Sequence, residues 1–301
     1  MFLWHYNDTG APIKVGITVG NAGSSAYSLH NVNDSVQVLG MGSISDMGRC
    51  AATALVGGTM DSISPKDSSA PAGGMGVVRE WNVPKQQIVG GIIEFTISNQ
   101  TPGVALNYRV RTVAANNTSA DLKLNQNAVV NYYAAPNGSI HPRGSWGFAD
   151  IASSVSYSAG SGLKYYSINN GELDNIMTSD NSYKIAGVPT LQGPANSNKG
   201  HYGVKYNLSV NLTNTGPQKT VKIYLASRGA EYYAGAVQWS GDGVTYRVPN
   251  LAAPGDTPGT NQDAVEVATV TLPTGANITR TITVSTAGAA STPALIAFQT
   301  I

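Results

Sequence analysis

The stretch IKVGITVGN, residues 13–21, decides the fold class of this 301-residue chain. Its apolar side chains occupy every second position: Ile13, Val15, Ile17 and Val19. Successive side chains of a strand point to opposite faces, so this spacing predicts a strand with one buried face. The strand should end at Asn21, because an Ala-Gly pair follows it and such residues favour turns.

The same design recurs twice further along the chain. IIEFTISN (92–99) and YNLSVNLTN (206–214) also alternate, and each ends at an asparagine with glycine or proline close behind. This recurrence indicates two related β-sandwich halves. Asp242-Gly243 predicts a hairpin, because glycine accepts the positive φ of such turns. Alternation predicts further strands at 106–114, 220–227, 277–285 and 294–301.

Helix is expected in one place. SDMGRCAATALVGG (45–58) has capping residues at its start and a Gly-Gly stop, which predicts one short helix near residues 46–56. The chain is therefore predicted to be all-β, with one or two antiparallel β-sandwiches joined by Greek-key-like connections. We expect one sandwich half over residues 1–135 and another over 136–301, with a single continuous unit as the alternative.

Composition disfavours several classes of partner. Apolar residues make up 42% of the chain, enough for a packed core, whereas charged residues make up only 12%, about half the usual share. A net charge of +1 gives no long-range field, so nucleic acid and anionic membranes are poor candidate partners, and we expect no nucleic-acid partner. No apolar run approaches the length of a membrane span.

The first residues and the cysteine content bear on location. MFLWHYNDTG lacks the basic segment and the long apolar segment of a signal peptide. We interpret the chain as the mature form or a fragment of an extracellular or cell-surface protein, with a cytosolic protein as the alternative. Cys50 has no partner for an internal disulfide and should pack as a small apolar group.

Nine Asn-X-Ser/Thr triplets are candidate N-glycosylation sites, although a chain rich in these residues also produces them by chance. They begin at Asn7, Asn33, Asn99, Asn116, Asn117, Asn137, Asn207, Asn211 and Asn277.

The sequence lacks the catalytic, nucleotide-binding and metal-binding motifs that would indicate an enzyme. It has no nucleophile elbow and no dinucleotide or phosphate loop, and no two of its four histidines have ligand spacing. We expect no cofactor. Structural calcium stays open, because Asx clusters at 31–35, 173–175, 179–181 and 241–243 could donate oxygens. A glycan-active enzyme needs only two carboxylates across a groove, for which Glu94, Glu172 and Glu231 are the candidates.

Aromatic residues give the binding hypothesis. One tyrosine of each adjacent pair should face outward if the pair lies on a strand, where its ring can stack on a sugar or anchor an interface. The alternative is that both faces are covered or that the pairs lie in turns. The candidate binding residues are Tyr132, Tyr133, Tyr165, Tyr166, Tyr232, Tyr233 and Trp239.

Two arginines are predicted to be structural. Arg143 and Arg228 each precede a glycine, with aromatic residues close behind. We expect each guanidinium to be buried and bonded to backbone carbonyls or an acid, because its planar fork satisfies several acceptors at once.

These motifs carry a family resemblance. The start WHYNDTGAPIKVGITVGNAGS, the His-Pro-Arg-Gly run at 141–144, GHYGVKYNLSVNL at 200–212 and the Arg-Gly-Ala run at 228–230 resemble the C-terminal β-rich region of secreted Bacillota proteins. Those proteins carry a copper amine oxidase-like N-terminal domain, which is absent from this chain. The resemblance implies secretion and a cell-surface location, and it carries over no copper site. The family has Arg-Gly-Gly where this chain has Ala230, so a purely backbone role for that third position is in doubt.

Three function classes follow. The first is a non-enzymatic structural protein of the cell surface that assembles with itself into a fibre or layer. Its apolar terminal stretches, FLWHY at 2–6 and ALIAFQTI at 294–301, would exchange between subunits unless they pair within their own sandwich. The second is a carbohydrate-binding module that uses outward tyrosines on cell-wall glycan. The third is the glycan-active enzyme.

Overall fold

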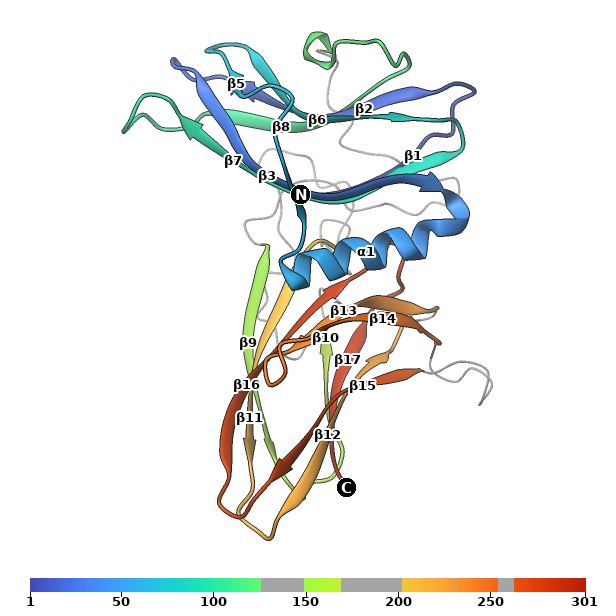
Figure 1. Ribbon diagram of the computed structural model, residues 1–301, viewed down its shortest axis with the longest axis vertical. Coiled ribbons are helices and arrows are strands. Elements are labelled where there is room, and N and C mark those ends of the chain that lie inside the picture. Colours follow the sequence, from blue (N-terminus) through green and yellow to red (C-terminus); the bar gives the residue numbers. More distant parts are fainter. Residues whose placement is uncertain (126–148, 169–201, 230, 254–262) are drawn as a thin grey trace, which may run out of the picture. The chain divides into compact units, whose positions relative to one another are not determined.

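A computed structural model describes residues 1–125, 149–168, 202–229, 231–253 and 263–301 (Figure 1). The chain divides into two compact units. Unit 1 comprises Met1–Met47 and Met60–Val129, and unit 2 comprises Gly48–Thr59 and Val130–Ile301. The predicted boundary between residues 135 and 136 lies outside the described residues and stays a prediction.

Unit 1 is built from two sheets. One sheet has the order β1-β7-β3-β4, with β5 also paired to β3, and the other has the order β6-β2-β8 (Figure 1). Ile17 of β2 packs with Leu29 of β3 and Ile93 of β7, so the core lies between the two sheets. The strands are β1 (Phe2–Tyr6), β2 (Ile13–Asn21), β3 (Tyr27–Gly40), β4 (Asp61–Ile63), β5 (Ser69–Ala70), β6 (Met75–Val83), β7 (Gln87–Asn99) and β8 (Tyr108–Ala115), followed by a short 3-10 helix, η2 (Leu122–Leu124).

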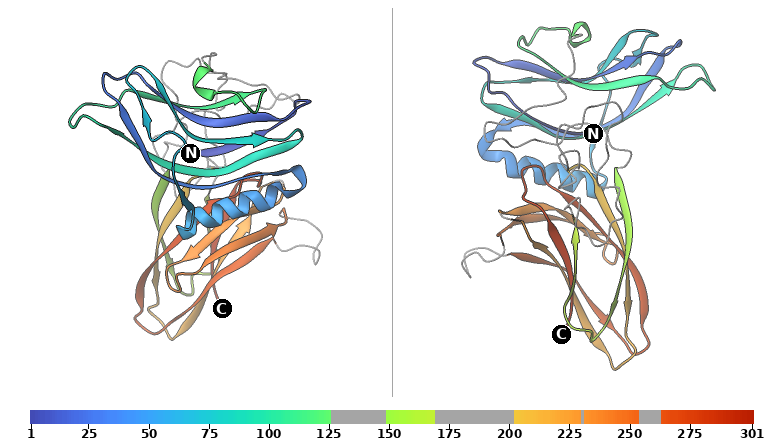
Figure 2. Two further views of the ribbon diagram at one scale, coloured as in Figure 1. Left: turned by 45° about the horizontal axis from the view of Figure 1, so that its top comes forward. Right: turned by 180° about the vertical axis from the view of Figure 1, so that it is seen from behind.

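Unit 2 is a second sandwich. Its sheets have the orders β14-β13-β16-β11-β9 and β10-β17-β12-β15, and Figure 2 gives two further views of them. Leu208, Ile223 and Phe298 belong to one core formed by both sheets. Among the described pairings only β9 with β11 is parallel. The strands are β9 (Asp150–Ser158), β10 (Lys164–Ile168), β11 (Lys205–Thr213), β12 (Lys219–Ser227), β13 (Tyr233–Trp239), β14 (Thr245–Leu251), β15 (Ala264–Leu272), β16 (Asn277–Thr286) and β17 (Ala294–Thr300).

The predicted helix is α1 (Ile44–Gly57), which follows the 3-10 turn η1 (Met41–Ser43). In unit 2, Ala52 and Val56 of this helix pack on Ala236 of β13. Cys50 is half-buried and free. The prediction of an all-β fold is therefore confirmed, with the helix where the sequence placed it.

Asparagines at strand ends connect the two sheets in each unit. The Asn21 side chain accepts the Gly23 N–H at 2.8 Å and donates to the Ser25 carbonyl at 2.9 Å and to the Ala70 carbonyl at 3.0 Å. Ala70 belongs to β5, in the opposite sheet. The repeated Asn turn is thus a buried hydrogen-bonded link.

The corresponding residue of unit 2 is Asn214, which follows β11. It accepts the Gly216 N–H at 3.1 Å and donates to the carbonyls of Pro217 and Leu272, at 2.8 and 2.9 Å. Leu272 ends β15, again in the opposite sheet. Both asparagines are almost completely buried, at 3% and 2% exposure. The two units therefore use one residue type for the same link.

The terminal strands pair within their own units. β1 pairs with β7 in unit 1, and β17 lies between β10 and β12 in unit 2. Of the two alternatives left open by the sequence, pairing within their own sandwich is the one that the structure shows. Among the described strands, β17 has a paired neighbour on each side, whereas β1 lies at the edge of its sheet and pairs only with β7.

Candidate binding face of the four-stranded sheet

Two tyrosines lie in one row across the sheet β10-β17-β12-β15. Tyr165 of β10 is the register partner of Ala297 in β17, and Ala297 is the partner of Tyr224 in β12. Directly opposite residues project to the same face of a sheet. Because neighbouring strands lie about 4.8 Å apart, the two tyrosines stand about 10 Å apart with a small residue between them.

Strand alternation turns this row away from the core. Ile223 and Leu225 of β12 are buried in the core of unit 2, so Tyr224 between them faces outward. In β10, Tyr166 packs on Phe298 edge-to-face, with 6.0 Å between ring centroids, whereas Tyr165 is 51% exposed. This doublet therefore has one ring in the core and one outside, as predicted for a pair on a strand.

Arg228 borders the exposed Tyr165 ring. Its Nη1 donates to Ser167 Oγ at 3.0 Å, and its Cζ lies 5.7 Å from the Tyr165 ring centroid, within cation–π range. Ser167 is the next outward residue of β10. The contact places a guanidinium beside the aromatic row, with donors left over for a ligand.

The prediction that the Arg228 guanidinium is buried was wrong. Arg228 is exposed, because Ser227 before it faces the core and the following residue is turned outward. The next residue, Gly229, lies in close contact with the neighbouring backbone, because a Cβ there would lie 2.9 Å from the Thr292 carbonyl oxygen. The guanidinium bonds to a side-chain hydroxyl rather than to a carbonyl or an acid, and the backbone N–H of Arg228 donates to the Pro293 carbonyl at 3.0 Å.

An ion pair borders the Tyr224 side of the row. Lys222 Nζ lies 2.7 Å from Glu266 Oε2, and Glu266 also accepts a hydrogen bond from Thr269. The hydrogen bond from Lys222, followed by that from Thr269, lowers the pKa of Glu266, and the same bond to Glu266 raises the pKa of Lys222. The face therefore offers two aromatic rings, a guanidinium and a self-neutralised ion pair, which suits the apolar faces and hydroxyls of a sugar.

The other predicted binding residues lie elsewhere. Tyr232 packs on a small alanine cluster. Tyr233 and Trp239 are core residues, at 0% and 5% exposure, so their prediction as ligand-binding residues was wrong. Alternation explains both, because odd positions of β13 face the core of unit 2. Tyr132, Tyr133 and Arg143 lie outside the described residues.

Most candidate glycosylation sites stay predictions. Asn7 is the exception, because it is 1% exposed and its amide donates to the carbonyls of Ala11 and Val83 at 3.0 and 2.9 Å. Its side chain is used in the fold, so the prediction for this residue was wrong. Asn116, Asn117 and Asn277 are exposed, Asn33, Asn99, Asn207 and Asn211 are half-buried, and Asn137 lies outside the described residues.

In the described part of the chain, no three His, Cys, Asp or Glu side chains gather into a group that could hold a metal ion. Residues 31–35 belong to β3, and Asp242 accepts the Val244 N–H and the Tyr246 hydroxyl at 2.9 and 2.7 Å. Glu94 lies in unit 1 and Glu231 in unit 2. Glu172 and the clusters at 173–175 and 179–181 lie outside the described residues.

One residue of the face escaped the sequence reasoning. Tyr224 is not part of a doublet, and the tyrosines predicted to bind a ligand are all members of doublets. The signal was nevertheless present, because Tyr224 stands between Ile223 and Leu225 in an alternating strand.

Comparison with known proteins adds little to this geometry. No protein-family model and no curated protein matches the chain. Among solved structures, an anti-sigma factor domain-containing protein from Clostridium clariflavum is 10% identical, with a TM-score of 0.17, over 100% of this chain and 86% of that one. A multicopper oxidase from Campylobacter jejuni, a metallo-oxidase, is 11% identical, with a TM-score of 0.13, over 94% and 47%. Scores this low carry no argument about function. No helix in the described residues is long and apolar enough to cross a membrane.

Proposed function

We propose that this chain is a non-enzymatic structural protein of the cell surface that holds cell-wall glycan on the outer face of β10-β17-β12. The observation that carries the glycan-binding part is the row Tyr165–Ala297–Tyr224. Its two rings are spaced by about 10 Å, close to the length of a disaccharide unit in an extended β-linked chain. Ala297, at 8% exposure, forms a low floor between them.

The row favours binding over chemistry. Tyrosine rings supply apolar contact area at a low entropy cost, and their hydroxyls supply hydrogen bonds. Arg228 and the Lys222–Glu266 pair stand at the edges of the row, where they can bond to sugar hydroxyls without acting on a glycosidic linkage.

The location and the structural role rest on other grounds. The family resemblance supports secretion, and the low charge content suits a protein that works by contact rather than by attraction at long range. Self-assembly into a fibre or layer stays a prediction without the support of free terminal strands. Negative-stain electron microscopy of the purified protein tests it directly.

Binding to purified cell-wall glycan and to soluble β-linked oligosaccharides tests the glycan hypothesis. We expect Tyr165→Ala or Tyr224→Ala to weaken binding by about tenfold, equivalent to about 1.4 kcal/mol, because each change removes one stacking ring. Tyr246→Ala is the control for Tyr165→Ala, because Tyr246 is 41% exposed and Tyr165 51%, but Tyr246 lies in the other sheet of unit 2.

A Tyr165→Ala/Tyr224→Ala protein that stays folded and binds glycan as tightly as the wild type would overturn the hypothesis. Equal losses in the double variant and in Tyr246→Ala would do the same.

A further inference from the structure

Unit 1 contains an open depression of about 510 Å³ at one end of the sheet β6-β2-β8. It is remote in sequence from the aromatic row and belongs to the other unit. Its lining includes Gly20, Met75, Arg109, Arg111 and Lys123.

Strand register explains why the depression is open and basic. Gly20 of β2 stands between Met75 of β6 and Arg109 of β8. A Cβ at Gly20 would meet nothing nearer than the Arg109 carbonyl oxygen, at 3.8 Å, so the floor between these strands is bare. Arg111 lies two residues further along β8, about 7 Å away and on the same face.

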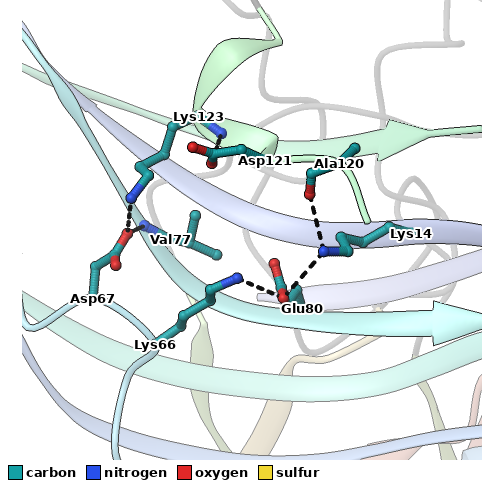
Figure 3. A network of polar contacts seen from close by, with 8 residues as sticks. All are labelled: Lys14, Lys66, Asp67, Val77, Glu80, Ala120, Asp121 and Lys123. Carbon is teal, nitrogen blue, oxygen red and sulfur yellow. Dashed lines mark hydrogen bonds and ion pairs between the residues drawn. The ribbon is translucent and has the colours of Figure 1, made fainter. Parts of the chain in front are cut away.

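The nearby acids are already paired with other cations. Figure 3 shows Lys14 and Lys66 directed at Glu80, at 3.4 and 2.6 Å, and Lys123 directed at Asp67, at 3.4 Å. Lys14 also donates to the Ala120 carbonyl, at 2.9 Å.

This network leaves the two arginines without an acid. None of the residues that line the depression is Asp or Glu. In the part of the chain that the structure describes, neither Arg109 nor Arg111 forms an ion pair. Two guanidinium groups on one strand edge therefore present an excess of positive charge to solvent.

A buried hydroxyl lies beside them. Thr18 is the register partner of Arg111, it is 0% exposed, and its Oγ1 has no hydrogen-bond partner among the described residues. This hydroxyl does not line the depression, so the site rests on the two arginines and on the bare floor at Gly20.

We propose that Arg109 and Arg111 bind an oxyanion. Guanidinium groups bind carboxylates and phosphates through paired, charge-assisted hydrogen bonds, and the bare floor at Gly20 leaves room for such a group beside them. The carboxylate of a uronic acid and the phosphate of a polyphosphate share this chemistry. The site does not depend on the proposed glycan face, because the residues, the unit and the ligand charge all differ.

Titration calorimetry at low salt with tetragalacturonate, inorganic polyphosphate and neutral maltotetraose tests the proposal. We expect one or both anions to bind and the neutral sugar not to bind at this site, and the preferred anion identifies the source of the oxyanion. Arg109→Gln/Arg111→Gln should weaken anion binding at least tenfold. Lys85→Gln is the matched control, since Lys85 is an exposed cation of unit 1 beyond the far end of β6.

A second variant distinguishes binding in a shaped site from nonspecific attraction between the anion and the basic surface. Gly20→Leu keeps every charge and fills the floor, and it should weaken anion binding to a similar degree while tyrosine-dependent glycan binding is unchanged. The proposal fails if the wild type binds neither anion, if Lys85→Gln loses as much as the arginine variant, or if folded Gly20→Leu binds normally.

Discussion

Asp34 is the buried acid whose charge state should affect the stability of unit 1. It is 6% exposed, and its Oδ2 lies 3.1 Å from Arg79 Nε without the alignment of a hydrogen bond. Burial raises the pKa of Asp34; the neighbouring Arg79 opposes that rise, and Asp61 adds to it. The pairing with Arg79 therefore offsets only part of the cost of burying this carboxylate.

This shift predicts a pH dependence. The folded-state pKa lies above the unfolded value, so folded protein binds more protons between the two values and gains stability as pH falls through the folded pKa. Asp34→Asn cannot titrate, so we expect the wild type to gain in unfolding free energy relative to Asp34→Asn as pH falls from neutral to about 4. Urea unfolding across that range measures the difference, and a constant difference would contradict the prediction.

At the scale of strands, the links at Asn21 and Asn214 stabilise the places where one sheet meets the other. Each side chain is buried and bonded through both its amide and its carbonyl. Truncation would leave the buried carbonyls of Ala70 and Leu272 without their donor and the partly buried N–H groups of Gly23 and Gly216 without their acceptor. The strand end would then lose its fixed approach to the opposite sheet.

We expect Asn214→Ala to lower the unfolding free energy by about 2–4 kcal/mol, because buried carbonyls lose their donor. Asn214→Asp should be at least as harmful at neutral pH, since it keeps the acceptor for Gly216 but points a carboxylate at carbonyl oxygens. Urea unfolding measures both. Asn277→Ala is the control, because that asparagine is exposed, and comparable losses in all three variants would contradict a specific role for the link.

Elements that depend on residues close together in the sequence could be predicted, whereas the register between strands could not. Alternation and turn residues predict β2, β7, β11 and α1, because apolar periodicity and local turn chemistry set them. Register is not local. Tyr165 and Tyr224 meet in one row only because β10 and β12 both pair with β17, and no pattern within any one of these strands encodes that pairing.

The same limit applies to the basic depression. Arg109 and Arg111 are visible in the sequence as the polar face of a strand, and Gly20 is visible as a small residue before a turn. Their meeting depends on the pairing of β2 with β8. The error at Arg228 differs, because extending the alternation of β12 by one residue would have turned that side chain outward.

At the scale of the whole molecule, the two units are not consecutive pieces of chain. Residues 48–59 belong to unit 2, although the residues on both sides of them belong to unit 1. Within this segment, Ala52 and Val56 of the helix pack on Ala236 and so cover part of β13. Unit 2 is therefore incomplete in any fragment that begins after the helix.

We expect residues 130–301 produced alone to unfold at a lower urea concentration than unit 2 does in the full chain, because Ala52 and Val56 are missing from β13. Adding a separate fragment of residues 1–129 should restore part of the loss. The same fragment with Ala52→Asp should not, since a charge would be buried against Ala236. Equal unfolding midpoints with and without the added fragment would contradict this expectation.

The chain passes between the units three times, after Met47, Thr59 and Val129. Two domains joined by a single linker would separate under tension once that linker was cut. Here a break at any one crossing leaves a segment still held in the other unit by strand pairing or helix packing. After such a break, separating the two units by force requires the disruption of strand pairing or helix packing, not only the extension of a linker.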